Sequence, residues 1–181
     1  VKATGGENGG NGGEIETSGH WFDVGQATDV SAVAGDGGTW LIDPYNIAVV
    51  AGGANTNINA GSPFESTGNS SSLGVDLVNT ALGSGDVIIR TGAGGSQAGD
   101  INWGVAYTYA GGNERTLTLQ AHRDIVLSES IASSGGALNL VITADSDGNN
   151  TGGVVVGDDL STNGGDLTFN GVGTIFSGGA A

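Results

Sequence analysis

Cysteine and methionine are absent from the 181 residues, and proline occurs only twice. A chain without cysteine has no disulfide, no thiolate metal ligand and no thiol nucleophile. Basic residues are also scarce: four of them stand against 19 acidic residues, which gives a formal net charge of −15. Nucleic acids and anionic membrane surfaces are bound through a surplus of Lys and Arg. We therefore expect neither as a partner.

Membrane insertion is not expected either, because no apolar run approaches the roughly 20 residues that span a bilayer. The N-terminal residues 1–6 (VKATGG) resemble neither a signal peptide nor a start-methionine context. From them we expect a processed or excised piece of something longer.

Glycine is the abundant residue, with 37 positions, but it follows no collagen-like period. Hydrophobic residues make up 37% of the chain and aromatic residues 6%. This share is too high for a simple disordered linker and predicts a thin, aliphatic core. Helices are hard to place, because each glycine inside a helix costs about 1 kcal/mol relative to alanine.

Short alternating apolar runs predict strands. The glycine-free segment 115–134 carries its apolar side chains only at odd positions, such as Leu117, Leu119 and Ile125. A period of two is typical of a strand. Similar runs, most of them preceded by Gly, Asp or Ala turns, begin at Val87, Ile101, Leu138, Val154 and Leu167.

Two architectures fit many short strands: a sandwich or barrel built from hairpins, or a parallel β-helix. Leu117 and Leu138 are 21 residues apart, and Leu138 and Leu160 are 22 residues apart. A coil of about 20 residues with three short strands is the repeat unit of a β-solenoid. Hairpin turn pairs flanked by strands are few, Asn170-Gly171 being one of them. The pattern favours the β-solenoid.

Three segments carry a family resemblance. Together they resemble the filamentous-haemagglutinin-type exoproteins of bacterial two-partner secretion, in which G-x-[VI]-E-T-S-G and W-L-[LI]-D-P segments precede L-T-L-x-A-x-x-D-I strands. The match covers most of residues 9–145, whereas residues 145–181 match only in style, and the family's N-proximal secretion domain is absent. The segments are GGEIETSG at 12–19, TWLIDPYNIAV at 39–49, and LTLQAHRDIVL at 117–127 continuing to LNL at 138–140.

The resemblance implies a right-handed parallel β-helix that is secreted or held at the bacterial cell surface and serves adhesion, biofilm cohesion or a toxin stalk. It carries no catalytic residues onto this chain. We expect one all-β domain over residues 1–181 with about 8 to 9 coils. At roughly 4.8 Å per coil, these would form a rod about 40 Å long. Residues 52–79, rich in Asn, Ser, Gly and Thr, are the expected loop insertion.

Aromatic side chains are the first candidate binding residues. Trp103, Tyr107 and Tyr109 share one parity, so they extend a single stripe along the strand. An exposed stripe would suit a glycan or a protein partner, whereas a buried stripe would only be packing. The pair Trp40 and Tyr45 poses the same alternative.

A calcium loop is the second candidate. Asp145, Asp147 and Asn149 place oxygen ligands at alternate positions, as calcium loops do. The closing Glu of an EF-hand is missing and no nonapeptide repeat follows, so an acidic turn is the competing interpretation. We expect no cofactor, with Ca²⁺ as the alternative.

Enzymatic activity is not expected. Asp147, Asp158 and Asp159 loosely resemble the paired aspartates of β-helical polysaccharide hydrolases. That family also wants a G-H-G histidine and a downstream basic pair, both missing here. No Gly-x-Ser-x-Gly elbow and no phosphate-binding P-loop occur.

The expected function is therefore that of a structural, adhesive segment of a secreted bacterial exoprotein. Its expected partners are a host or bacterial surface glycan or protein, or a matrix polysaccharide. Because terminal coils of a solenoid have unpaired strand edges, we also expect head-to-tail stacking of copies, into filaments at the extreme. The alternatives are a polysaccharide-processing enzyme on the same scaffold and a calcium-stabilised binding module.

Overall fold

The structure is a computed structural model, and it describes residues 1–18, 26–43, 46–53, 71–91 and 98–177. The described residues form 15 strands and one helix, and every pairing between these strands is parallel. The expectation of a mainly β fold with parallel strands is confirmed. An antiparallel sandwich is excluded for these strands.

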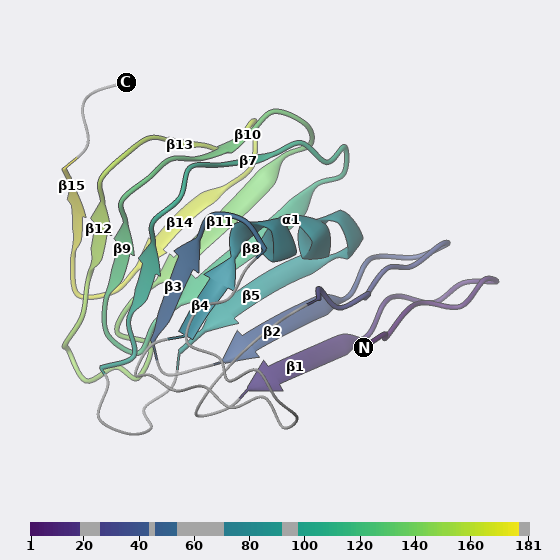
Figure 1. Ribbon diagram of the computed structural model, residues 1–181, viewed down its shortest axis with the longest axis horizontal. Helices are drawn as coiled ribbons and strands as arrows, with labels where there is room; N and C mark the ends of the chain where they lie inside the picture. Colours follow the sequence, from purple (N-terminus) through teal and green to yellow (C-terminus); the bar gives the residue numbers. More distant parts are fainter. Residues whose placement is uncertain (19–25, 44–45, 54–70, 92–97, 178–181) are drawn as a thin grey trace.

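The strands belong to three sheets (Figure 1). The first sheet has the order β1-β2-β5-β8-β11-β14, the second β15-β12-β9-β6-β3-β4, and the third β13-β10-β7. The bounds in the first sheet are β1 Glu14–Ser18, β2 Thr39–Asp43, β5 Asp86–Arg90, β8 Arg115–Gln120, β11 Leu138–Thr143 and β14 Leu167–Asn170. In the second sheet they are β3 Ile47–Val50, β4 Ser71–Gly74, β6 Ile101–Trp103, β9 Ile125–Leu127, β12 Val154–Val156 and β15 Thr174–Phe176. In the third sheet they are β7 Tyr107–Tyr109, β10 Ile131–Ser133 and β13 Leu160–Ser161.

The chain visits the three sheets in turn. It runs from β8 in the first sheet to β9 in the second and β10 in the third, and then returns to the first sheet as β11, the neighbour of β8. Each visit adds one strand to each sheet, so strands that pair are distant in sequence.

The register aligns equivalent side chains into columns. In one column Leu117 pairs with Val87 on one side and with Leu140 on the other, and Leu140 pairs with Leu167. Val87, Leu117 and Leu140 are buried, and with the inward residues of the other sheets they form one hydrophobic core. Successive side chains of a strand point to opposite faces. The predicted odd-position alternation in 115–134 is therefore the core-facing stripe of β8, β9 and β10.

The interval between paired strands is longer than the 20-residue coil expected from the sequence. Leu160, which was assigned to the column of Leu117 and Leu138, instead pairs with Ile131 in the third sheet, and Leu138 itself pairs with Arg115. Hydrogen bonds between equivalent positions of paired strands span 24 to 30 residues. The two larger sheets hold six strands each in the described part of the chain, which does not match 8 to 9 coils.

A helix occupies part of the segment that was expected to be a loop. The predicted insertion at 52–79 falls partly on residues 54–70, outside the described residues, but 71–74 form β4 and α1 spans Val75–Ser84. Val78, Ala81 and Leu82 are fully buried at helical spacing. Packing of this face, and not intrinsic helix propensity, stabilises so short a helix.

Helix α1 contacts β4, β5 and β8, and the hydroxyl of Tyr107 on β7 donates to Oδ1 of Asn79 at 3.2 Å. The helix therefore lies against all three sheets (Figure 1). Among the described residues, no helix has the length and apolar character that a bilayer crossing requires.

Candidate functional site

The predicted aromatic stripe is buried. Trp103 is fully inaccessible, and Tyr107 and Tyr109 are 6% and 2% exposed. The residues do share one parity, but that parity faces the core. The hypothesis of an exposed aromatic binding surface at these three residues is wrong. Trp40 is also buried, and Tyr45 lies outside the described residues.

The polar atoms of the stripe bond inside the protein. Trp103 Nε1 donates to the carbonyl of Val105 at 2.7 Å, and the Tyr109 hydroxyl donates to the carbonyl of Asn113 at 2.8 Å. The rings of Trp103 and Tyr107 lie 6.0 Å apart. Burial raises the pKa of both tyrosine hydroxyls. These side chains anchor the connections next to β6 and β7, and they present nothing to a ligand.

The candidate calcium loop follows β11. The carboxylate of Asp145 accepts hydrogen bonds from the backbone N–H groups of Asn150 and Thr151, at 3.2 and 3.4 Å. Asp147 accepts from the backbone and the side-chain amide of Asn149, at 3.3 and 2.7 Å. The carboxylate oxygens thus fold the turn on itself. Within the described part of the chain, no group of three or more His, Asp or Glu residues could hold a metal ion.

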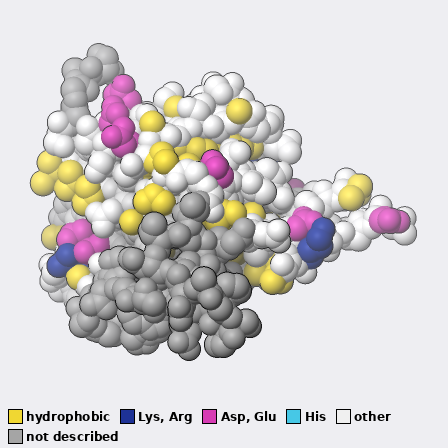
Figure 2. All heavy atoms as spheres, in the orientation of Figure 1, with side chains coloured by type: hydrophobic (Ala, Val, Ile, Leu, Met, Phe, Trp, Pro, Cys, Tyr) yellow, Lys and Arg dark blue, Asp and Glu magenta, His cyan; other side chains and the backbone are white. Residues whose placement is uncertain are grey.

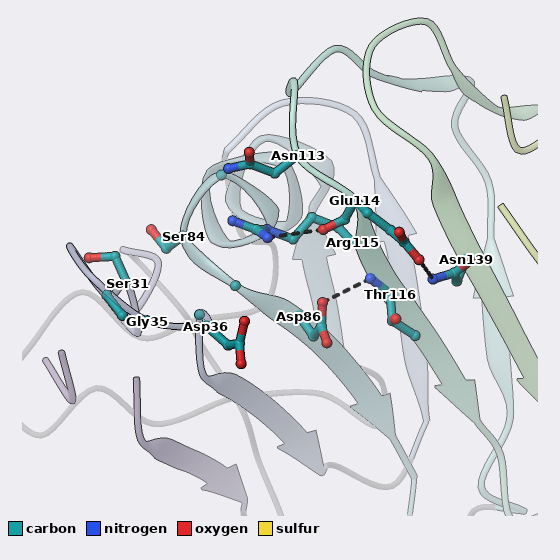
Figure 3. A pocket seen from close by; sticks show the side chains of 14 residues that line it. Ser31, Gly35, Asp36, Ser84, Asp86, Asn113, Glu114, Arg115, Thr116 and Asn139 are labelled. Atoms are coloured by element: carbon teal, nitrogen blue, oxygen red, sulfur yellow. Dashed lines mark hydrogen bonds between the residues drawn. The ribbon is translucent and has the colours of Figure 1, made fainter. Parts of the chain in front are cut away.

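A polar groove of about 590 Å³ lies beside the starts of β5 and β8 (Figure 3). It is bounded by a turn that precedes β2, by the C-terminal end of α1 and by the first residues of β5, β8 and β11. Its size falls in the range of small-molecule sites. The lining residues are Ser31, Ala32, Gly35, Asp36, Gly37, Gly83, Ser84, Gly85, Asp86, Asn113, Glu114, Arg115, Thr116 and Asn139.

Most charged groups of the groove are tied to the framework. Oδ1 of Asp86 accepts the backbone N–H of Thr116 at 2.9 Å, and Oε1 of Glu114 accepts the side-chain amide of Asn139 at 2.9 Å. Arg115 Nε donates to the carbonyl of Leu82 at 2.9 Å. The remaining oxygens suit hydroxyl donors. Sequence analysis missed this groove, although Gly85-Asp86 stands out as a turn before a strand.

Side chains at the entries of the second sheet bond from layer to layer. Oδ1 of Asn46 accepts the N–H of Asp100 at 2.8 Å, Oδ1 of Asp100 accepts the N–H of Asp124 at 3.2 Å, and Oδ1 of Asp124 accepts the N–H of Gly153 at 3.0 Å. We call these four residues the entry column. They directly precede β3, β6, β9 and β12.

Arg123 neutralises two carboxylates of the entry column. Its Nε and Nη2 atoms donate to the two oxygens of Asp100 at 2.8 and 2.6 Å, and Nε also lies 3.0 Å from Asp124 Oδ2. The hydrogen bond with Asp100 raises the pKa of the guanidinium. Two-pronged pairing of this kind fixes geometry as well as charge.

The two ends of the stacked strands differ. We call β13, β14 and β15 the C-terminal edge, and β1 and β4 the N-terminal edge. Four of the six exposed large hydrophobic residues among those described lie at the C-terminal edge, and Figure 2 shows hydrophobic atoms at the left of the molecule, where β15 lies in Figure 1. At the N-terminal edge, Ile15 and Leu73 are buried. The four exposed residues are Leu167, Val172, Ile175 and Phe176.

Comparison with known proteins adds no name to this arrangement. No protein-family model matches the chain, and no curated protein matches it.

Proposed function

We propose that the chain is a structural and adhesive segment of a secreted bacterial exoprotein and that its backbone winds as a right-handed parallel β-helix. The observation that carries this proposal is the repeated visit to three parallel sheets with aligned, buried columns. Chain connections between parallel strands of one sheet are overwhelmingly right-handed. An experimental structure with left-handed connections would contradict this part of the proposal.

The family resemblance supports the same assignment, because its three segments coincide with elements of the stacked sheets. Residues 12–19 contain β1, residues 39–49 contain β2 and most of β3, and residues 117–140 run from β8 into β11. A motif that matched by chance would have no reason to follow strand positions. The secreted, surface-held role is carried over from the resembled exoproteins.

The mechanism is geometric. Interstrand hydrogen bonds along three sheets and one continuous aliphatic core resist bending, so the segment holds its outward side chains at fixed positions. A surface glycan, a surface protein or a matrix polysaccharide would contact these side chains. The polar groove of Figure 3 is the best-shaped such position on the described residues.

Adhesion is tested with beads that carry the chain and are drawn by flow over surfaces coated with mucin-type glycoprotein, exopolysaccharide or bacterial cells. We expect retention above that of beads carrying an unrelated folded protein of similar negative charge. Two variants of equal charge form the matched pair: Leu117→Asp places a carboxylate in the core, and Thr118→Asp places it on the opposite face of the same strand. Only Leu117→Asp should lose retention.

Two results would contradict adhesion by a folded rod. One is retention no higher than that of the unrelated protein on every surface. The other is equal retention by the two variants, which would make the contact a matter of charge and not of shape. Circular dichroism of both variants shows which of them keeps the strands.

A polysaccharide-processing enzyme is the second candidate, and the groove is the observation that favours it. Asp36, Asp86 and Glu114 place three carboxylates around one hollow (Figure 3), and glycoside hydrolysis uses a pair of carboxylates. Release of new reducing ends from neutral polysaccharides, abolished by Asp86→Asn or Asp36→Asn, would support an enzyme. No release from any polysaccharide tested would remove this candidate.

A further inference from the structure

We propose that two copies of this chain associate through their C-terminal edges, tail to tail, and that this contact closes as a two-fold dimer. The inference deepens the end-to-end association within the proposed function, and it rests on the parallel stacking described above. It replaces head-to-tail stacking by a contact between two identical ends.

The first observation is the change in exposure along the core columns. Leu140 on β11 is 1% exposed, whereas its partner in the next layer, Leu167 on β14, is 42% exposed. Val156 on β12 is 3% exposed, whereas its partner Phe176 on β15 is 64% exposed. The same inward position is thus covered in one layer and open in the last. What is exposed here is a cross-section of the core.

The second observation is the size of the open patch. Leu167, Val172, Ile175 and Phe176 are each between 42% and 64% exposed. With roughly 150–200 Å² for a fully exposed residue of this size, these fractions amount to about 400 Å² of surface per copy. Two such patches bury about 800 Å², and the surrounding backbone and polar rim bring the total to the lower part of the range for specific interfaces, roughly 1,200 Å².

The third observation is the state of the other end. In the edge strands β1 and β4, the core-facing residues Ile15 and Leu73 are 9% and 0% exposed. A head-to-tail contact would therefore set an open apolar face against an end whose core residues are already covered. The matching face for the C-terminal edge is a second C-terminal edge. An isologous contact of this kind uses the same patch twice and ends at two copies.

The backbone of the edge supports the contact. β14 pairs with β11 and β15 pairs with β12 on one side only, so each retains a row of N–H and C=O groups on its other side. Two copies related by a two-fold axis bring such strands together in antiparallel orientation. The added hydrogen bonds would join the apolar contact across the interface.

Charge sets the conditions. Asp158, Asp159 and Asp166 are exposed on or next to the strands of the C-terminal edge. A tail-to-tail contact brings these carboxylates of both copies toward one another, and salt screens the repulsion. Association should therefore strengthen as ionic strength rises.

The test is sedimentation velocity of the full 181-residue chain over a range of protein and salt concentrations. We expect a monomer–dimer equilibrium that shifts toward the dimer with added NaCl and shows no larger species. The variant Phe176→Ser should weaken dimerisation at least tenfold. The matched control is Val33→Ser, which removes an 83% exposed valine far from the C-terminal edge and should leave dimerisation unchanged.

Single-cysteine variants identify the end that is used, because the natural chain has no cysteine. Under mild oxidation Ile175→Cys should form a covalent dimer, and Val33→Cys should not. Monomer at every concentration, growth beyond two copies, equal weakening by both serine variants, or equal cross-linking of both cysteine variants would overturn the proposal. Adhesion is measured separately on beads, so a dimer that does not adhere would refute the adhesive role and leave this contact standing.

Discussion

The free energy that one leucine contributes should depend on its layer. Leu117, Leu140 and Leu167 occupy one column of the first sheet, at 0%, 1% and 42% exposure. Replacing leucine by alanine removes roughly three methyl or methylene groups, each worth about 0.8 kcal/mol when buried. Leu117 also has stacked neighbours on both sides, so a cavity term is added and the cost reaches about 3–4 kcal/mol.

Leu167 ends the column, so its truncation leaves no enclosed cavity and removes atoms that are already partly hydrated. We expect Leu167→Ala to lower the free energy of unfolding by about 1 kcal/mol, and Leu140→Ala by nearly as much as Leu117→Ala. The assay is urea unfolding followed by circular dichroism, at protein concentrations low enough to keep the chain monomeric. Stacked repeats can unfold in stages, so the denaturant slopes of all variants are compared as well.

Thr118→Ala on the opposite face of β8 is the matched control and should change the free energy by no more than about 0.5 kcal/mol. Equal costs for Leu117→Ala and Leu167→Ala would refute the argument, because they would mean that the last layer is covered. A cost below about 1 kcal/mol for Leu117→Ala would show that the column does not support the fold.

Three further predictions concern the loops and the N-terminal segment. Gly152→Ala should destabilise by at least about 1–3 kcal/mol in urea unfolding, because Gly152 has φ +137° and an added Cβ would collide with the carbonyl oxygen of Arg123; Gly112→Ala, where that space is open, should be nearly neutral. Hydrogen bonds from Lys2 and then Ser31 lower the pKa of Asp29 to about 2, from an ordinary 3.8, so the link between Lys2 and Asp29 is complete above pH 4 and is lost as the pH falls toward 2. An NMR titration of the Asp29 carboxyl group checks this, and a midpoint that Lys2→Gln does not raise would contradict it. Calcium at millimolar concentration should leave Tm where an equal ionic strength of NaCl leaves it, because the Asp145 and Asp147 carboxylates bond within their own loop; a rise specific to Ca²⁺ would contradict this and favour a calcium-stabilised module.

Alternation could be read from the sequence because it depends on local chemistry. Leu117, Leu119 and Ile125 are buried as their parity predicts, since strand geometry alone decides which residues share a face. The partner of each strand was harder to predict. Leu138 and Leu160 have the same composition and spacing as true neighbours, yet they lie in different sheets, because turns of unequal length separate the strands.

Tertiary context explains the other errors. Residues 75–82 are free of glycine for too short a stretch to predict a helix, and α1 is stabilised by packing on β5 and β8. The parity of Trp103, Tyr107 and Tyr109 was correct, but parity does not say which face is the interior. The groove near Asp86 unites segments from four separate parts of the chain, so no local motif could indicate it.

The entry column has a consequence for how this chain tolerates change in length. The same contact, a side-chain oxygen accepting the N–H of the next member, joins residues that are 24, 29 and 54 positions apart. Alignment is thus reset at each strand entry, whatever length of polypeptide intervenes. Insertions and deletions between two entries can accumulate without shifting the strands that follow, so the turns are free to diversify while the column keeps count.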